Sequence, residues 1–191
     1  MSNSIIVENS NNALIVRFTR PEIRNPLSVD VLESLDRIID QASNSAGVEK
    51  IIFTGTGNAF ASGADLREIA SLTPEKAKGF SLRGQYLMNK ITVASKPTVA
   101  AINGFCFGGG LDLALACNRR IASPTATFCH PGASLGIITG WGGTQRLPRL
   151  IGQANALEMF FTATQISAPH ALRIGLVDSI IDDPIASCLS S

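Results

Sequence analysis

The chain has 191 residues, of which 45% are hydrophobic and 16% charged, a composition that suits one globular domain and excludes an intrinsically disordered segment. A formal net charge of +1 gives no electrostatic reason to expect nucleic acid or an anionic membrane as a partner. The polar N-terminal segment lacks the basic and apolar regions of a secretory signal, and no apolar run approaches the roughly 18 residues of a membrane-spanning helix, so we expect a cytoplasmic protein.

Hydrophobic patterning predicts the elements in chain order. The first half contains strands over 5–7 and 13–18, a helix over 31–42 with Ser28 as N-cap, a strand over 51–53, a short helix beginning near Ala64 and a longer helix over 74–94. The second half contains a strand over 98–102, a helix over 111–117, a strand over 120–122, helices over 142–150, 155–161 and 168–174, and a strand over 177–181. Because continuous apolar strands alternate with helices, the sequence predicts an α/β fold with a largely parallel sheet.

Residues 1–183 are expected to form the core domain. The remaining segment, 184–191, shows no periodic pattern and is expected to be a short, loosely held tail.

Cysteine and arginine side chains give further expectations. Four cysteines occur without a C-x-x-C pair or a histidine at ligand spacing, which favours buried free thiols and no metal site: Cys106, Cys117, Cys129 and Cys188. Four arginines add positive charge to the second half of the chain: Arg119, Arg120, Arg146 and Arg149. A phosphorylated ligand would suit them, but solvated surface side chains are the favoured interpretation.

Three consecutive glycines, Gly108-Gly109-Gly110, lie between an apolar strand and a helix. Bare backbone N–H groups and the helix dipole at such a corner can hold a developing oxyanion. Asp112 follows Gly109 by three residues, nearly one helical turn, so its carboxylate would lie close to the same backbone amides. Glycine clusters also bind phosphates or permit tight strand–helix packing, so this motif alone does not decide the chemistry.

A second loop-to-helix junction lies upstream, over residues 60–66. Gly63 allows a backbone turn, and the N–H of Ala64 is expected to be free because that residue would open a helix. Both junctions follow buried strands, so parallel strands would place them at the same edge. One amide from each could then hold a single carbonyl oxygen, and a thioester carbonyl suits this chemistry.

Six segments in a fixed order carry a family resemblance. They are Arg20-Pro21 with Asn25-Pro26-Leu27, Phe60 to Leu66, Lys96-Pro97 through Asn103-Gly104, Gly108-Gly109-Gly110, Gly142 to Leu147, and Ile166-Ser167-Ala168 with Ala171 and Gly175-Leu176-Val177. With these segments, which cover about residues 13–178, the chain resembles the enoyl-CoA hydratase/isomerase (crotonase) superfamily. The resemblance implies a spiral of ββα turns that binds an acyl-CoA thioester.

The resemblance also implies a site. The two oxyanion-hole amides of the family correspond to Ala64 and Gly109, and the loops expected to line the pocket and contact the CoA ester contribute Arg24, Asn25, Ala61, Gly63, Asp65, Leu66, Gly108 and Gly132. Coenzyme A enters as part of the substrate, with no separate cofactor. The family implies a homotrimer or a dimer of trimers. Asp65 and Glu68 are expected to be helix-end and surface charges.

The chain departs from the family pattern at both catalytic glutamates of the hydratases. Asp112 stands in place of the first, and Gly132, in the stretch Cys129-His130-Pro131-Gly132, stands in place of the second. A general acid–base group typically contributes about 10²- to 10⁴-fold, so this loss bears directly on water addition.

Three replacements are open. Asp112 alone could serve as the single base of an isomerase, or His130 could supply the missing acid or base. Alternatively, space at Gly132 could hold a water or small anion, as in the naphthoyl-CoA synthase branch, although Thr139 stands where that branch has an aspartate. Purely structural roles compete: a packed loop histidine for His130, and a dipole-stabilising first-turn carboxylate for Asp112.

The sequence therefore predicts a crotonase-fold enzyme that acts on enoyl-CoA or acyl-CoA as a hydratase or isomerase. Decarboxylation, thioester hydrolysis and C–C bond chemistry stay open. The rival hypothesis is a non-catalytic acyl-CoA-binding protein. The usual C-terminal helical trimerisation segment is expected to be missing or truncated, since the chain stops soon after Asp178. If the pocket is otherwise intact, Gly132→Glu should raise crotonyl-CoA hydration.

Overall fold

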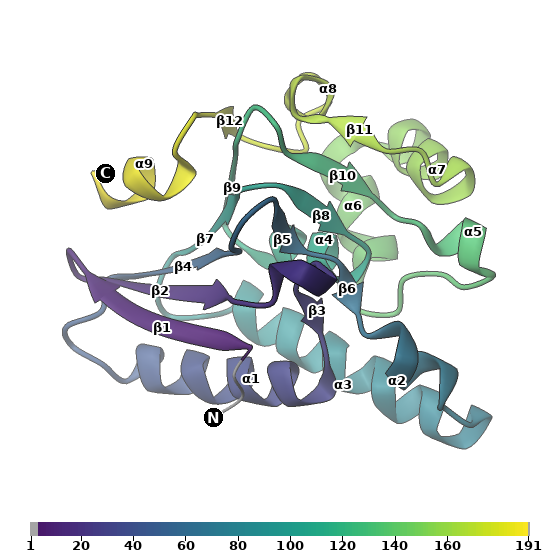
Figure 1. Ribbon diagram of the computed structural model, residues 1–191, viewed down its shortest axis with the longest axis horizontal. Helices are drawn as coiled ribbons and strands as arrows, with labels where there is room; N and C mark the ends of the chain where they lie inside the picture. Colours follow the sequence, from purple (N-terminus) through teal and green to yellow (C-terminus); the bar gives the residue numbers. More distant parts are fainter. Residues whose placement is uncertain (1–3, 191) are drawn as a thin grey trace.

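A computed structural model describes residues 4–190 (Figure 1). Its largest sheet has six strands in the order β1-β2-β4-β7-β9-β12. These strands are β1 (Ile5–Ser10), β2 (Ala13–Phe18), β4 (Lys50–Thr54), β7 (Thr98–Ile102), β9 (Arg119–Ala122) and β12 (Ser179–Ile180). Only the β1–β2 hairpin is antiparallel within this sheet, and the other neighbours are parallel. The predicted α/β fold with a largely parallel sheet is confirmed.

A second sheet of four short strands lies beside the first, in the order β11-β10-β8-β5. It consists of β5 (Ala59–Ala61), β8 (Phe105–Phe107), β10 (Thr127–Cys129) and β11 (Ile166–Ser167). Each turn of the chain adds one strand to each sheet, as in β4–β5, β7–β8 and β9–β10, and a helix follows. This repeated unit is the ββα spiral, and a small two-stranded sheet of β3 (Pro26–Leu27) and β6 (Gly63–Ala64) completes it.

The helices follow the sheets in chain order. They are the 3₁₀ turn η1 (Pro21–Ile23) and the α-helices α1 (Val29–Ser43), α2 (Leu66–Ala70), α3 (Pro74–Thr92), α4 (Gly109–Ala116), α5 (Gly132–Leu135), α6 (Gly143–Ile151), α7 (Gln153–Thr162), α8 (Ala168–Arg173) and α9 (Pro184–Leu189). The predicted cap of the first long helix is confirmed, because Ser28 Oγ accepts a hydrogen bond from the Val31 amide at 3.4 Å.

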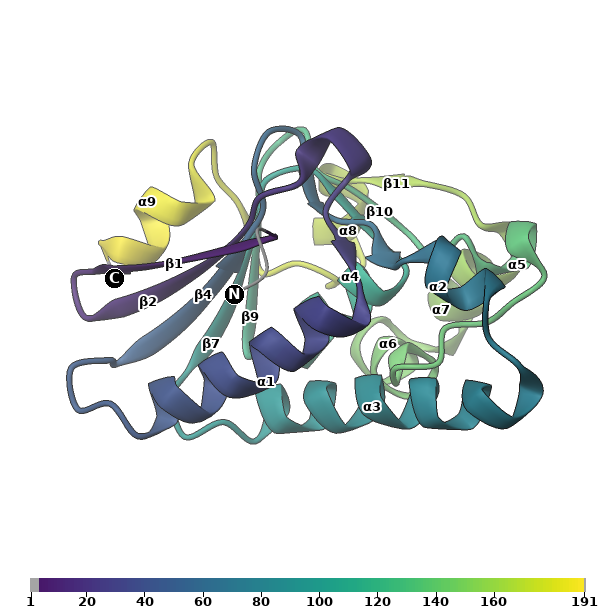
Figure 2. The same ribbon diagram turned by 60° about the horizontal axis from the view of Figure 1, so that its bottom comes forward.

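The six-stranded sheet is covered on both faces, which explains its continuous apolar strands. Along β2, Leu14 and Val16 point into the large core beneath α1 and α3, while Ala13 and Ile15 point to the opposite face. Figure 2 shows α1 and α3 side by side below the sheet and α9 above it. Lys90 of α3 links the two lower helices through ion pairs to Asp36 and Asp40, at 2.6 and 2.7 Å.

The expectation of a loosely held tail is not met over residues 184–190. Asp183 caps α9 by accepting bonds from the Ile185 and Ala186 amides, both at 3.0 Å. Pro184 and Cys188 are buried, and Cys188 packs on the second face of the sheet. The last residue of the tail lies outside the described part of the chain.

Candidate functional site

The two glycine junctions meet in space because β5 and β8, which precede them, are parallel neighbours. A Cβ placed on Gly63 would lie 2.6 Å from the Gly109 amide nitrogen, and one placed on Gly109 would lie 3.3 Å from the Ala64 amide nitrogen. No side chain fits in these gaps, and Gly63 has a φ of +93°. The glycines therefore let the two backbone segments approach closely.

Gly109 is the first residue of α4, so its amide has no acceptor within the helix. This amide lies at the N-terminus of the helix, which is the positive end of the helix dipole. The expectation that Ala64 opens a helix, and that its amide is free for this reason, was wrong. Ala64 belongs to β6 and is paired with Leu27, and α2 begins at Leu66 with Asp65 as its N-cap. The structure shows that the Ala64 amide lies next to Gly109.

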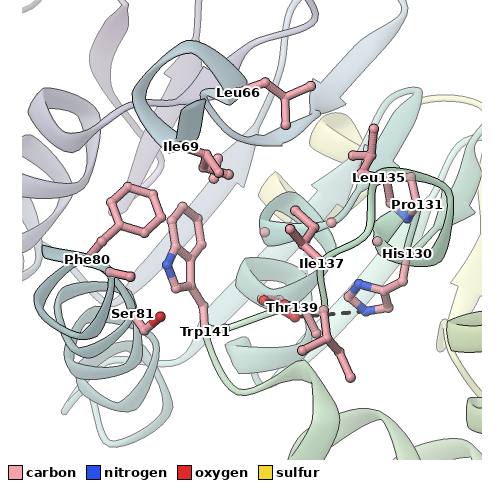
Figure 3. A pocket seen from close by; sticks show the side chains of 18 of the residues that line it. Leu66, Ile69, Phe80, Ser81, His130, Pro131, Leu135, Ile137, Thr139 and Trp141 are labelled. Atoms are coloured by element: carbon pink, nitrogen blue, oxygen red, sulfur yellow. Dashed lines mark hydrogen bonds and ion pairs between the residues drawn. The ribbon is translucent and has the colours of Figure 1, made fainter. Parts of the chain in front are cut away.

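A cavity of about 250 Å³ opens in front of these junctions (Figure 3). Its lining includes seven of the expected site residues: Ala64, Leu66, Gly108, Gly109, Asp112, His130 and Gly132. Apolar side chains form most of its remaining wall: Ile69, Leu72, Phe80, Leu135, Ile137, Ile138 and Trp141. An apolar cavity with few polar groups suits a small organic ligand.

Asp112 lies at the bottom of this cavity and is fully buried. Thr139 Oγ1 donates a hydrogen bond to its Oδ2, whereas Oδ1 has no hydrogen bond and lies 3.8 Å from Nε2 of His130. Burial raises the pKa of Asp112 to about 7, against the lowering effects of the Thr139 bond, the Arg146 charge and the amides of Trp141 and Gly143. The carboxyl group can therefore gain or lose a proton near neutral pH.

His130 is buried beside Asp112, and neither ring nitrogen has a hydrogen-bond partner. Its ring packs against Phe160 with a centroid separation of 5.0 Å. Burial lowers the pKa of His130 to about 4, so the imidazole is neutral at physiological pH. Figure 3 shows the imidazole beside Thr139 at the cavity wall, and both ring nitrogens are buried without a hydrogen-bond partner.

Gly132 has less space than the sequence suggested. A Cβ placed there would lie 2.5 Å from the carbonyl oxygen of Ile137, because the chain folds back after α5. The region where a glutamate side chain would begin is thus occupied by backbone. Gly132 lines the cavity without offering room for a longer residue.

Five residues expected near the CoA ester do not line the cavity: Arg24, Asn25, Ala61, Gly63 and Asp65. Asn25 is buried and structural, since its Nδ2 donates to the carbonyls of Ala59 and Phe60 at 2.8 and 3.2 Å. Ala61 is buried in β5, and Asp65 is paired with Arg67 at 2.6 Å, which supports its expected helix-end role. Arg24 is exposed, with its guanidinium 4.9 Å from the centre of the Phe105 ring.

Gly63 also lies behind the cavity wall, where it allows the close approach to Gly109. Trp141 and Thr139 are the site residues that sequence reasoning missed in these roles. Both lie in the loop between α5 and α6, and the available signal was a lone tryptophan within Gly140-Trp141-Gly142-Gly143.

The arginine and cysteine expectations have different outcomes. Arg120 is buried, so its assignment to the solvated surface was wrong. Its guanidinium donates to the carbonyls of Leu176 and Cys117 at 3.0 and 2.8 Å. All four cysteines are buried thiols outside any disulfide, as predicted. Within residues 4–190, no group of three or more histidine, cysteine or acidic side chains could hold a metal ion.

Comparisons with known proteins agree with this geometry. The family model described as enoyl-CoA hydratase/isomerase matches residues 8–185. The chain is 39% identical to the short-chain-enoyl-CoA hydratase of Clostridium acetobutylicum, covering 94% of this chain and 69% of that protein. It is 38% identical to the crotonyl-CoA hydratase of Syntrophomonas wolfei, covering 93% and 69%.

Solved structures show the same fold. Enoyl-CoA hydratase from Bacillus anthracis superposes with a TM-score of 0.90 at 36% identity, over 98% of this chain and 72% of that one. DspI from Pseudomonas aeruginosa gives a TM-score of 0.94 at 31% identity, over 99% and 73%. None of the helices in the described part of the chain has the length and apolar character needed to cross a bilayer.

Proposed function

The chain belongs to the enoyl-CoA hydratase/isomerase family, and on that premise we propose that it adds water to a 2-enoyl-CoA thioester with Asp112 and His130 as its proton-handling pair. The observation that carries this proposal is the buried carboxyl of Asp112, with an unpaired oxygen 3.8 Å from an unpaired nitrogen of His130. Both groups line the cavity that also contains Gly109.

The thioester carbonyl oxygen is placed at the amide of Gly109, with the adjacent Ala64 amide as the second donor. Negative charge develops on this oxygen when the β-carbon is attacked, and the N-terminus of α4 stabilises it. The donors belong to the backbone, so they are positioned before the substrate binds.

Asp112 and His130 together supply what the two family glutamates would supply. A water bound beside the pair, within hydrogen-bond reach of both side chains, donates a proton to the Asp112 carboxylate as its oxygen attacks the β-carbon. The resulting enolate then takes a proton at the α-carbon from Asp112, which regenerates the carboxylate. Neutral His130 holds the water, and Thr139 holds Asp112 through the bond to Oδ2.

A one-base isomerase is the second candidate, favoured by the missing carboxylate at Gly132. Asp112 would remove a proton from the α-carbon of a 3-enoyl thioester and return it to the γ-carbon. This reaction needs no bound water, so His130 would be dispensable. The two candidates differ in their response to a change at that residue.

The test is a spectrophotometric assay with crotonyl-CoA and a 3-enoyl-CoA, combined with calorimetric binding of butyryl-CoA. Loss of conjugated absorbance from crotonyl-CoA establishes hydration, and new conjugated absorbance from the 3-enoyl ester establishes isomerisation. We expect Asp112→Asn to lower kcat/KM by about 10²- to 10⁴-fold while the Kd for butyryl-CoA stays constant. Asp30→Asn, the same change at an exposed position of α1, is the matched control.

His130→Gln separates the two reactions. In this variant the rate of hydration should fall, whereas the rate of one-base isomerisation should not change. Binding of butyryl-CoA without conversion of either substrate would contradict catalysis on these esters and support the acyl-CoA-binding alternative.

Arg24 is proposed to contact the nucleotide of CoA from the exposed side of the site, so Arg24→Ala should raise KM and leave kcat unchanged. A cytoplasmic location and the trimer or dimer of trimers implied by the resemblance are part of the same proposal. Light scattering of the purified protein measures its assembly.

A further inference from the structure

Trp141 is the only tryptophan of the chain, and it lies against the proposed oxyanion site. It lines the cavity yet is only 3% exposed, so its indole is part of the wall and not a surface side chain. Figure 3 shows the ring between Phe80 of α3 and the loop that carries Thr139. The proposed chemistry does not use this side chain.

Two glycines make room for the indole. A Cβ placed on Gly84 of α3 would lie 2.1 Å from the indole Cδ1, and one placed on Gly109 of α4 would lie 2.4 Å from Cζ3. The Phe80 ring packs on it at a centroid separation of 5.7 Å and an interplanar angle of 40°. The indole therefore fills the space between α3 and α4 and is held on several sides.

This position is close to the reacting carbons. Gly109 is the residue whose amide is proposed to hold the carbonyl oxygen, and the Trp141 ring touches that glycine. The backbone amide of Trp141 also lies near enough to Asp112 to lower its pKa. An acyl chain that continues past the β-carbon toward α3 meets the indole at once.

We propose that Trp141 is a specificity-determining residue whose indole closes the acyl end of the cavity between α3 and α4 and restricts the enzyme to short, unbranched enoyl-CoA thioesters. This inference rests on the proposed function for the placement of the thioester. Gly84 and Gly109 have no side chains that could close the same space, so a smaller residue at 141 would open it. Ile137, in the loop after α5, lines the same cavity and is 42% exposed.

Tryptophan fluorescence reports on this contact directly, because no second indole contributes. The titrants are CoA, acetyl-CoA, butyryl-CoA and hexanoyl-CoA, with CoA as the control for adenine absorbance. We expect butyryl-CoA to change the emission of Trp141 beyond the change produced by CoA. Identical emission with CoA and with every acyl-CoA would contradict contact between the acyl group and the indole.

Chain-length selectivity is then measured by calorimetry with saturated esters, which needs no turnover. Each buried methylene is worth about fourfold in affinity. In the wild type we expect no gain from butyryl-CoA to hexanoyl-CoA, since the indole blocks the two added carbons. In Trp141→Ala the gain should reach about tenfold or more, and Trp141→Phe should be intermediate.

Ile137→Ala is the matched control on the other wall, and it should leave the ratio of the two affinities unchanged. A shifted ratio in Ile137→Ala with an unchanged ratio in Trp141→Ala would overturn the proposal by placing the acyl chain along the exposed loop. If Trp141→Ala does not fold, Trp141→Phe and the wild-type fluorescence carry the decision.

Failure of the proposed function is separable from failure of this inference. A wild type that converts no enoyl-CoA but shows the predicted binding ratios contradicts hydration and keeps the role of Trp141. An active wild type whose affinity rises normally from butyryl-CoA to hexanoyl-CoA keeps hydration and contradicts the role of Trp141.

Discussion

Burial acts on Asp112 and His130 in the same direction, since it favours the neutral form of each. The pKa of Asp112 rises to about 7 and that of His130 falls to about 4. Over the range between these values, both side chains are predominantly neutral, and above about 7 Asp112 carries the only charge of the pair. The cavity thus holds one group that titrates near neutrality and one that does not.

The pH dependence of the reaction follows from this difference. We predict that kcat/KM for crotonyl-CoA rises about tenfold per pH unit below pH 7 and is level above it, because only ionised Asp112 accepts a proton. His130 should cause no further change in kcat/KM between pH 5 and pH 8, because its pKa of about 4 lies outside that range. Initial rates at low substrate concentration across this range test the profile, and a falling limb just above pH 7 would mean that a protonated acid is required.

Asp112 should also make folding stability depend on pH. Its folded pKa of about 7 lies above the 3.8 of an unperturbed aspartate, so its contribution to stability is fully present below pH 3.8 and is lost as pH rises through about 7. We predict that Asp112→Asn is more stable than the wild type by about 4 kcal/mol at pH 8, with no such gain near pH 3.8. Urea denaturation at several pH values measures this, and Asp30→Asn should show no comparable trend.

At the scale of elements, the length of each helix or strand decided whether the sequence could predict it. The long helices and the strands β2, β4, β7 and β9 were found because each has a continuous apolar face or run. The short strands β5, β8, β10 and β11 have two or three residues and no measurable period. Their pairing is made by contacts between distant segments, which local patterning does not contain.

Helix α9 was missed for the same reason, although its start carried a signal. Asp183 followed by Pro184 is a typical N-cap and first-turn pair, but six residues are too few to show helical periodicity. We predict that Asp183→Ala lowers the free energy of unfolding by about 1 kcal/mol, because two amides lose their acceptor. Neighbouring Asp182, exposed and outside the cap, is the control, and equal losses from both alanine variants in thermal melts would contradict the capping role.

The start of α5 changes the expectation for a restored glutamate. The space for a side chain at residue 132 is taken by the Ile137 carbonyl, so we predict that Gly132→Glu lowers stability and does not raise hydration of crotonyl-CoA. Gly132→Ala should lower stability similarly, because both variants share the Cβ. A glutamate variant that is faster than the wild type would show that the loop after α5 can move aside.

At the scale of the whole molecule, the cavity is assembled from segments far apart in the chain. The positions of the glycine junctions were predictable, because glycines that follow apolar strands are visible in the sequence. The bond from Thr139 to Asp112 and the packing of Trp141 on Gly84 were not, since both depend on the loop after α5 folding across α3 and α4. Parallel topology brought the backbone of the site together, and loop packing completed it.

The proposed carbonyl-binding groups at Ala64 and Gly109 are main-chain amides, and a main-chain amide survives every substitution except proline. Mutations that alter Thr139, His130 or Trp141 can therefore change which proton moves or which acyl group fits while polarisation of the thioester persists. The scaffold is robust in the step that every such reaction shares and open to change in the steps that distinguish them. Libraries randomised at these three positions should retain thioester binding even in members that have lost the parent reaction, which makes the chain a suitable starting point for evolving new enolate chemistry.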